Sequence, residues 1–259
     1  PREYLGVEGE RLRTVKLKGQ LSQGLLLPLV GDNSEEGKDF SEILGITEWE
    51  DTRYMANMDA RGNFPDFIPK TDQERVQNLD RTLEKYFGQS FEVTVKRDGS
   101  SLTAFVNGEE SGVCSRNVNL KETEDSAFWA AANSLSLIPK ILSTGRNLAL
   151  QGELMSQKIQ GNYEKVQGIE WNCFDIYDID TQEYLLPKER RESGQQLRIP
   201  HIKVVEEDFV LWHNVDQLLE MAEGPGVNAG VKREGLVFKS NGVVFSFKAI
   251  SNSYLLKHG

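Results

Sequence analysis

The stretch that organises this chain reads Phe91-Glu92-Val93-Thr94-Val95-Lys96-Arg97-Asp98-Gly99. Apolar and polar residues alternate as far as Lys96, which predicts a β-strand with one buried face. The pair Asp98-Gly99 then predicts a tight turn. A lysine that ends a strand just before a turn is expected to project into a cleft. The stretch therefore indicates a hairpin that presents the amine of Lys96.

Strands and helices are predicted on both sides of this stretch. Strands are expected over residues 102–106, around Val113, and over 148–154, 169–176, 236–238 and 243–247. Helices are expected over 72–86, with Asp72 as N-cap, and over most of 126–142, whereas the charged residues 188–196 predict a mobile loop. The pattern indicates an α+β domain built on antiparallel sheet, which we expect to span residues 1–259.

The composition and net charge exclude some classes of protein. The chain has 259 residues, 38% hydrophobic and 27% charged, and a net charge of −10. Its apolar runs are too short for a membrane-spanning helix, and the negative charge argues against a broad nucleic-acid binder while leaving room for a narrow basic cleft. Cys114 and Cys173 lie in apolar runs and predict buried, reduced thiols. We expect a monomer in an intracellular, reducing compartment, with no membrane partner.

Residues suited to phosphate and metal chemistry follow Lys96 in a fixed order. They are Ser115-Arg116, Gly152-Glu153, Phe174 within Trp171-Asn172-Cys173-Phe174-Asp175, Glu234-Gly235-Leu236-Val237-Phe238-Lys239, and Phe247-Lys248. This ordered series resembles the motif set of the covalent nucleotidyltransferases, the superfamily of polynucleotide ligases and mRNA capping enzymes. Agreement in order along the chain is far more specific than any single motif.

The resemblance narrows to the Naegleria/Deinococcus-type RNA ligases. Residues 18–28, which include Lys18-Gly19-Gln20-Leu21-Ser22-Gln23-Gly24, are similar to that group, as are residues 67–75 and 246–251. The resemblance implies ATP-dependent ligation, with RNA bearing 5′-phosphate and 3′-hydroxyl ends as the partner and Mg²⁺ or Mn²⁺ as the metal. It also implies an OB module N-terminal to this domain.

The resemblance further assigns a nucleotide site. Lys96 becomes the acceptor of a covalent AMP, and Val95 belongs to the nucleotide-binding set. Glu153 meets the ribose and the metal shell, and Phe174 stacks on adenine. Because stacking alone does not distinguish purines, we expect polar groups on the strand before Lys96 to select adenine: this strand carries Glu92 and Thr94, with Thr94 and the strand backbone nearest to the base.

Three acids are expected around a catalytic metal. The resemblance places Asp98, Glu153 and Glu234 there, holding its waters. Carboxylates provide the hard oxygen environment that suits Mg²⁺, which keeps most of its water ligands. A metal beside Lys96 also opposes protonation of the amine, which must be neutral to attack phosphorus.

Cations are expected around the phosphates. The resemblance implies that Lys248 and Lys239 neutralise the α-phosphate and that Arg116 and Arg75 serve phosphate or RNA ends. One position departs from the family pattern, because Ser246 stands where ligases often have the first lysine of a Lys-x-Lys pair.

Ordinary structural roles compete with several of these assignments. Glu153 could be an edge acid, Phe174 a core aromatic, Lys239 and Lys248 solvent-facing residues of late strands, and Arg75 a partner of Asp72 or Asp80 on its own helix.

Three other functions also stand beside RNA ligation. They are a DNA ligase, a GTP-dependent mRNA capping guanylyltransferase, and a noncatalytic RNA-binding domain that retains the fold. The retention of Lys96 and of the acids disfavours the last of these.

Overall fold

The computed structural model describes residues 59–157 and 159–258, and, before them, four short strands together with Ser41 and Gly45. The strands are β1 Arg2–Tyr4, β2 Val7–Gly9, β3 Val15–Leu17 and β4 Gln20–Ser22, paired as β1 with β2 and β3 with β4. Of the ligase-like segment 18–28, only Gln20–Ser22 lies within the described residues. The chain divides into two compact units, Pro1–Thr52 and Arg53–Gly259. The second contains every residue to which the sequence assigns a chemical role.

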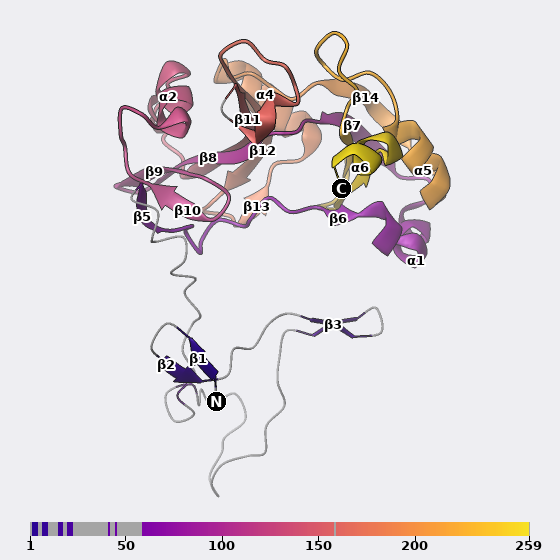
Figure 1. Ribbon diagram of the computed structural model, residues 1–259, viewed down its shortest axis with the longest axis horizontal. Helices are drawn as coiled ribbons and strands as arrows, with labels where there is room; N and C mark the ends of the chain where they lie inside the picture. Colours follow the sequence, from indigo (N-terminus) through magenta and orange to yellow (C-terminus); the bar gives the residue numbers. More distant parts are fainter. Residues whose placement is uncertain are drawn as a thin grey trace, which may run out of the picture. The chain divides into compact units, whose positions relative to one another are not determined.

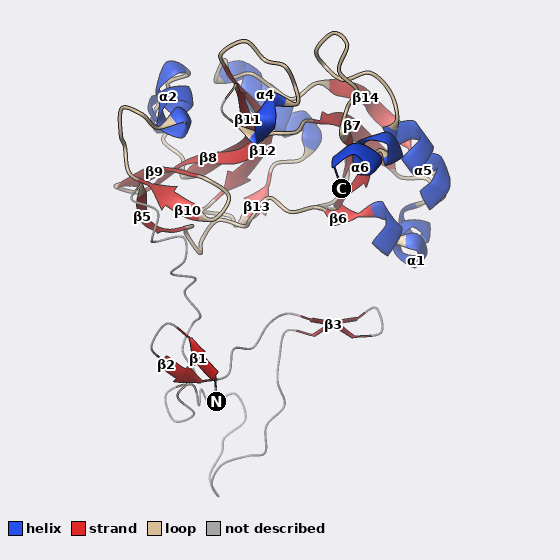
Figure 2. Ribbon diagram, viewed as in Figure 1, coloured by secondary structure: helices blue, strands red, loops and turns tan. Residues whose placement is uncertain are grey.

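Two sheets form the second unit (Figures 1 and 2). The larger has the order β13-β12-β11-β8-β9-β10-β5, with β5 Ala60–Asn63, β8 Ser100–Asn107, β9 Glu110–Cys114, β10 Val118–Leu120, β11 Leu148–Ser156, β12 Ile169–Asp178 and β13 Glu183–Tyr184. The smaller has the order β14-β7-β15-β16-β6, with β6 Glu74–Arg75, β7 Ser90–Lys96, β14 Val204–Val210, β15 Gly235–Ser240 and β16 Ser246–Ile250. Every pair within them is antiparallel except β16 with β6. The predicted α+β class is confirmed.

Strand β7 is buried on both faces, not on one as its alternation predicts. Its polar residues Glu92 and Thr94 are as inaccessible as its apolar ones. The second face is covered because Arg190 reaches Glu92 from another element. In register, Lys96 lies opposite Gly235 of β15, so the Lys96 turn and the start of β15 meet at one edge.

The helices are α1 Asp80–Leu83, α2 Ala127–Ser134, α3 Leu137–Leu142, α4 Pro187–Gln196, α5 Val215–Ala222 and α6 Asn252–His258, with 3-10 turns at Val76–Asn78, Glu84–Tyr86 and Gln160–Asn162. Helices α2 and α3 pack against the larger sheet and α5 against the smaller one. The helical prediction over 126–142 is confirmed, and Ser126 caps α2 by accepting the amide N–H of Trp129 at 3.3 Å.

Two predictions of local structure are wrong. Residues 72–86 form no single helix, because the backbone of Glu74 and Arg75 pairs in parallel with Phe247 and Lys248, and only short helical turns follow. The predicted loop over 188–196 is instead helix α4. Its first turn is stabilised by the Glu189 carboxylate, which accepts the backbone N–H of Leu186 at 3.1 Å.

Apolar clusters hold these layers together. One lies between the larger sheet and α2 and α3, and contains Trp129, Ile141, Leu150 and Trp171. Another packs the smaller sheet against α5 and the turns after β6. Both cysteines are buried free thiols, as predicted, and burial raises the pKa of Cys173 to about 12. Among the described residues, no helix combines the length and the apolar character that crossing a membrane requires.

Candidate active site

A pocket opens between the two sheets and collects most of the predicted site residues. Those that line it are Val95, Lys96, Arg116, Glu153, Phe174, Lys239 and Lys248. They come from strands of both sheets and from the turn after β9. Residues far apart in the sequence therefore meet around one cavity, as the ordered motifs predict.

The amine of Lys96 lies among carboxylates. It donates a hydrogen bond to Oε2 of Glu234 at 2.9 Å, and the side chain of Lys96 is 23% exposed. Burial alone lowers the pKa of Lys96, but Glu234, Glu153 and Asp98 together raise it above its ordinary value. The amine is therefore held in its protonated form by these acids. A cation that engages the same carboxylates would release the proton and free the nucleophile.

Glu153 is the most perturbed acid of this group. Burial raises its pKa to about 7; Glu234 and Asp98 add to this effect, while Lys96 opposes it. The backbone N–H of Gly99 lies near this carboxylate and also opposes the rise of its pKa. A carboxylate that titrates near neutrality beside a nucleophile is typical of functional sites.

The three acids do not form a direct metal cage. Among the described residues, no three histidine, cysteine, aspartate or glutamate side chains converge closely enough to ligate one ion. Asp98, Glu153 and Glu234 nevertheless lie close enough to Lys96 for all three to raise the pKa of its amine. Carboxylates of this kind suit a hydrated Mg²⁺ or Mn²⁺ that they would hold through waters.

An ion pair and hydrogen bonds to Glu164 and Asn172 hold the turn after Lys96 in place. The guanidinium of Arg97 lies 3.3 Å from the carboxylate of Glu164, both side chains being 1% exposed, and it donates to Asn172 Oδ1 at 3.0 Å. Glu164 also accepts the backbone N–H of Asp98 at 3.2 Å. A side chain at Gly99 would come within 2.5 Å of the carbonyl oxygen of Leu154, so the turn packs directly on β11. Sequence reasoning missed this anchor, because nothing nearby in the sequence marks Glu164 as its partner.

Cations gather at the end of the pocket formed by β6 and β16. Arg75 lies beside Lys248 in the strand pairing. Burial, then the charge of Lys96, lowers the pKa of Lys248, and Arg75 adds to the effect. Arg75 thus contributes positive charge near the position where Ser246 departs from the family pattern. Asp72 pairs with Arg116, at 2.7 and 2.8 Å, and not along a helix with Arg75.

The other end of the pocket carries an aromatic face. Phe174 is half-buried and lines the pocket, which favours a stacking role over a core role. The ammonium of Lys239 is paired with the Asp175 carboxylate, donates to the Phe174 carbonyl at 2.8 Å, and lies 5.7 Å from the centre of the Phe174 ring. Lys239 therefore supports the aromatic end of the pocket in addition to lining it.

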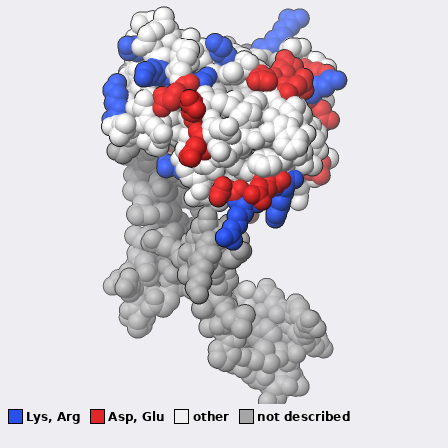
Figure 3. All heavy atoms as spheres, turned by 90° about the vertical axis from the view of Figure 1, so that its right-hand side faces the viewer, with Lys and Arg blue, Asp and Glu red and all other residues white. Residues whose placement is uncertain are grey.

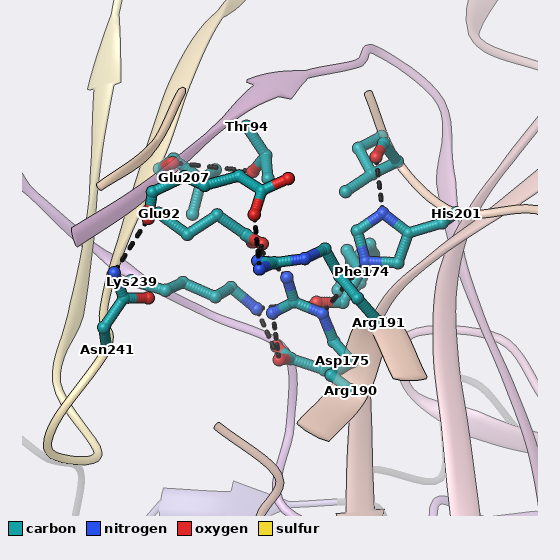
Figure 4. A network of polar contacts seen from close by, with 12 residues as sticks. Glu92, Thr94, Phe174, Asp175, Arg190, Arg191, His201, Glu207, Lys239 and Asn241 are labelled. Atoms are coloured by element: carbon teal, nitrogen blue, oxygen red, sulfur yellow. Dashed lines mark hydrogen bonds and ion pairs between the residues drawn. The ribbon is translucent and has the colours of Figure 1, made fainter. Parts of the chain in front are cut away.

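A buried ionic network that joins α4 to β7 lies next to Phe174 and Lys239 (Figure 4). Arg190 and Arg191 of α4 both point toward Glu92 of β7 and pair with its carboxylate. Glu92 and Arg190 are fully buried. Glu92 is thus occupied by arginines and does not line the pocket, whereas Thr94 does.

His201 extends the network to the pocket wall. Its Nε2 accepts a hydrogen bond from Nε of Arg190 at 3.1 Å, so its Nδ1 carries the proton and donates to the carbonyl of Ile202 at 2.6 Å. Ile202 lines the pocket. No local pattern signals this arrangement, because the three histidines are scattered along the chain and the charged residues 188–196 predict a loop.

Comparisons with known proteins agree with this geometry. A family model described as RNA ligase matches residues 89–250. Structures of Naegleria gruberi RNA ligase are similar to the chain. In one, a variant with ATP and Mn, the match is 49% identical, covers 98% of this chain and 78% of the Naegleria chain, and has a TM-score of 0.75. One with PPi is 49% identical, with coverages of 99% and 79% and a TM-score of 0.75. A lysine-to-methionine variant with AMP and Mn is 48% identical, with coverages of 98% and 79% and a TM-score of 0.76. No curated protein matches.

Proposed function

The chain belongs to the RNA ligase family, and on that basis we propose that it is an ATP-dependent RNA ligase that acts through a lysine–AMP intermediate. The observation that carries the proposal is the amine of Lys96, set in a pocket between acids on one side and cations on the other. Such a site suits attack on a phosphorus, where negative charge develops on the equatorial oxygens.

The reaction takes three steps. Nζ of Lys96 loses its proton and bonds to the α-phosphorus of ATP, and pyrophosphate leaves. The 5′-phosphate of RNA then bonds to the same phosphorus and releases the lysine. Finally a 3′-hydroxyl bonds to the 5′-phosphorus, the strand is sealed, and AMP leaves.

The residues of the pocket divide this work. Lys248 and Arg116 neutralise phosphate charge, and Arg75 beside Lys248 adds to the field. Phe174 stacks on the base, supported by the Lys239–Asp175 pair. Glu153 meets the ribose and the metal shell. Asp98, Glu153 and Glu234 would hold Mg²⁺ or Mn²⁺ through waters, and the ion would supply positive charge that favours a neutral Lys96.

Adenine selectivity is part of the proposal. The face of Phe174 accepts any purine, so the choice of base comes from polar groups at the base edge. Thr94 lines the pocket on the strand that leads to Lys96, and it is the side chain that supports this assignment.

The cellular setting is also proposed. Two buried free thiols support a reducing, intracellular compartment. A monomer, and an OB module N-terminal to a nucleotidyltransferase domain of residues 1–259, stay predictions.

The test is covalent labelling followed by sealing. The protein is incubated with labelled ATP or GTP and Mg²⁺ or Mn²⁺, and acid-stable label on the protein is measured. Labelling by ATP but not GTP, and faster sealing of RNA nicks than of all-DNA nicks, is the expected result. Efficient labelling by GTP would point to a capping guanylyltransferase, and equal sealing of DNA would point to a DNA ligase. The absence of any label would favour a noncatalytic RNA-binding domain.

A further inference from the structure

A second hollow, of about 650 Å³, lies outside the nucleotide pocket and is rich in cations. Its lining includes Lys165, Lys232, Lys257, His258 and Tyr163. None of the three lysines has an ion-pair partner among the described residues. The chain as a whole is acidic, with a net charge of −10, and on the face drawn in Figure 3 acidic and basic side chains are interspersed. Three lysines without an ion pair are therefore a local concentration of positive charge that suits a partner of opposite charge, although Glu223 acts on Lys232 and, after burial, nearby acids raise the pKa of Tyr163.

Aromatic rings accompany these cations. The ring of Tyr163 lies 5.2 Å from that of Tyr254 and 4.9 Å from that of His258, between centroids. The ammonium of Lys257 lies 5.8 Å from the centre of the Tyr163 ring. The Tyr163 hydroxyl donates to the carbonyl of Lys232 at 2.8 Å, which fixes the ring in the wall. Lysines beside aromatic faces are the chemistry that binds single-stranded nucleic acid, since phosphates pair with the cations and bases stack on the rings.

The hollow is connected to the nucleophile through side chains. Tyr254 packs on Tyr163, and it lies close enough to Asp98 for this carboxylate to add to the effect of burial in raising the pKa of the Tyr254 hydroxyl. Asp98 follows Lys96 by two residues, yet it does not line the nucleotide pocket. The contacts Tyr163–Tyr254–Asp98 therefore run from the hollow to the Lys96 turn on a side that the nucleotide pocket does not include.

This position fits the geometry of the sealing step. The 3′-oxygen loses its proton and bonds to the phosphorus of the adenylylated end while the bond to AMP breaks, and the attacking and leaving oxygens lie roughly in line on opposite sides of that phosphorus. AMP occupies the nucleotide pocket. The strand with the 3′-hydroxyl must then approach from outside it.

We propose that this hollow binds the RNA strand that carries the 3′-hydroxyl, with Lys232 and Lys257 on its phosphates and Tyr163 against a base. This inference rests on the proposed function and adds to it a location for one substrate strand. Lys165 also lines the hollow and adds positive charge to it. Its backbone lies in the left-handed region at φ 52°, so its substitution is a poorer test.

The test compares two double variants. Lys232→Ala/Lys257→Ala removes two charges from the hollow, and Lys85→Ala/Lys188→Ala removes two exposed charges elsewhere as a matched control. Self-adenylylation with ATP should stay within twofold of wild type in both, which also shows that both fold. Single-turnover sealing of a pre-adenylylated nicked RNA should then need about tenfold more protein for half-maximal rate in the first variant only. For the Lys232→Ala/Lys257→Ala variant, the slope of the logarithm of RNA affinity against the logarithm of salt concentration should be shallower by about 1.5. Each phosphate contact contributes about 0.7 to 0.9 to that slope.

Substrate length identifies the strand. Shortening the 3′-hydroxyl strand to two nucleotides should remove the difference between wild type and the hollow variant, whereas shortening the 5′ strand should leave it. Equal affinity and salt slope in the two double variants would overturn the inference, as would a difference that persists with the short 3′-hydroxyl strand. A wild-type protein that neither labels with ATP nor seals would instead overturn the proposed function, and this inference with it.

Discussion

Lys96 and Glu234 meet through a 2.9 Å hydrogen bond between side chains that lie 138 positions apart in the sequence. The contact arises from the sheet, because Lys96 ends β7 opposite Gly235, the residue after Glu234. A side chain at Gly235 would collide with the carbonyl of Ala249 on β16, so glycine lets the strands close at this point. The pairing of β7 with β15 therefore delivers an acid to the nucleophile.

The first prediction concerns that nucleophile. Lys96→Met should abolish covalent AMP labelling, because methionine keeps the length of the side chain and loses only the amine. Lys85→Met, at an exposed position, is the control and should label as wild type does. Gel analysis of acid-stable label measures the outcome, with circular dichroism to verify the fold. Label at wild-type yield on the Lys96 variant would refute the central assignment.

The second prediction concerns the acids. Glu153→Ala and Glu234→Ala should each slow self-adenylylation by on the order of 10²- to 10³-fold, since each removes a positioned electrostatic group. Raising Mg²⁺ should restore the rate only in part. Glu192→Ala, on the exposed face of α4, should leave the rate unchanged. Normal rates in both acid variants with EDTA present would show that self-adenylylation does not depend on a metal ion.

The sequence predicted the parts of the fold that local pattern controls. The strands β8, β9, β11, β12 and β15 all carry apolar runs bounded by turn residues, and all form as expected. The return strand of the late hairpin, predicted over 243–247, instead forms as β16 over Ser246–Ile250, because Val243 and Val244 belong to the exposed turn. Helices α2 and α3 likewise form within the range 126–142 that the sequence predicts to be mostly helical. The site residues could be gathered in advance because their order along the chain is distinctive.

The wrong predictions for residues 72–86 and 188–196 have one physical cause: each segment contacts residues that are distant in the sequence. Residues 72–86 have helical spacing, but their first residues gain backbone partners on β16 that no local pattern reveals. Residues 188–196 look solvated because they are charged, yet Arg190 finds Glu92 98 positions away and becomes buried. A charged residue is predicted to be exposed unless its partner is known, and the partner appears only in the fold.

The third prediction tests that buried pair. Arg190→Met should lower the free energy of unfolding by about 3 to 5 kcal/mol, because it removes the buried partner of Glu92 and leaves Arg191 alone to neutralise that carboxylate. Lys188→Met, exposed on the same helix, should change it by less than about 0.5 kcal/mol. Urea unfolding measures both. Adding Glu92→Gln to the first variant should recover part of the loss, and a loss below 1 kcal/mol for Arg190→Met would show that the network contributes little.

The last prediction is a pH dependence of stability set by His201. Burial first, then the charge of Arg190, lowers the pKa of His201 from 6.5 to about 4. Between these two values the unfolded chain binds a proton that the folded protein does not, so stability is lost as the pH falls from about 6.5 to about 4. The full difference corresponds to about 3 kcal/mol.

His201→Gln isolates this contribution, because a glutamine oxygen still accepts from Arg190 Nε but does not titrate. Urea unfolding of both proteins at pH 7 and pH 4.5 gives the comparison. Wild type should lose about 2 to 3 kcal/mol more than the variant over this interval, since every other titrating group is common to the two. Parallel losses would mean that His201 binds its proton equally well in the folded protein, and so that the Nδ1-protonated tautomer bridging Arg190 and Ile202 is not maintained.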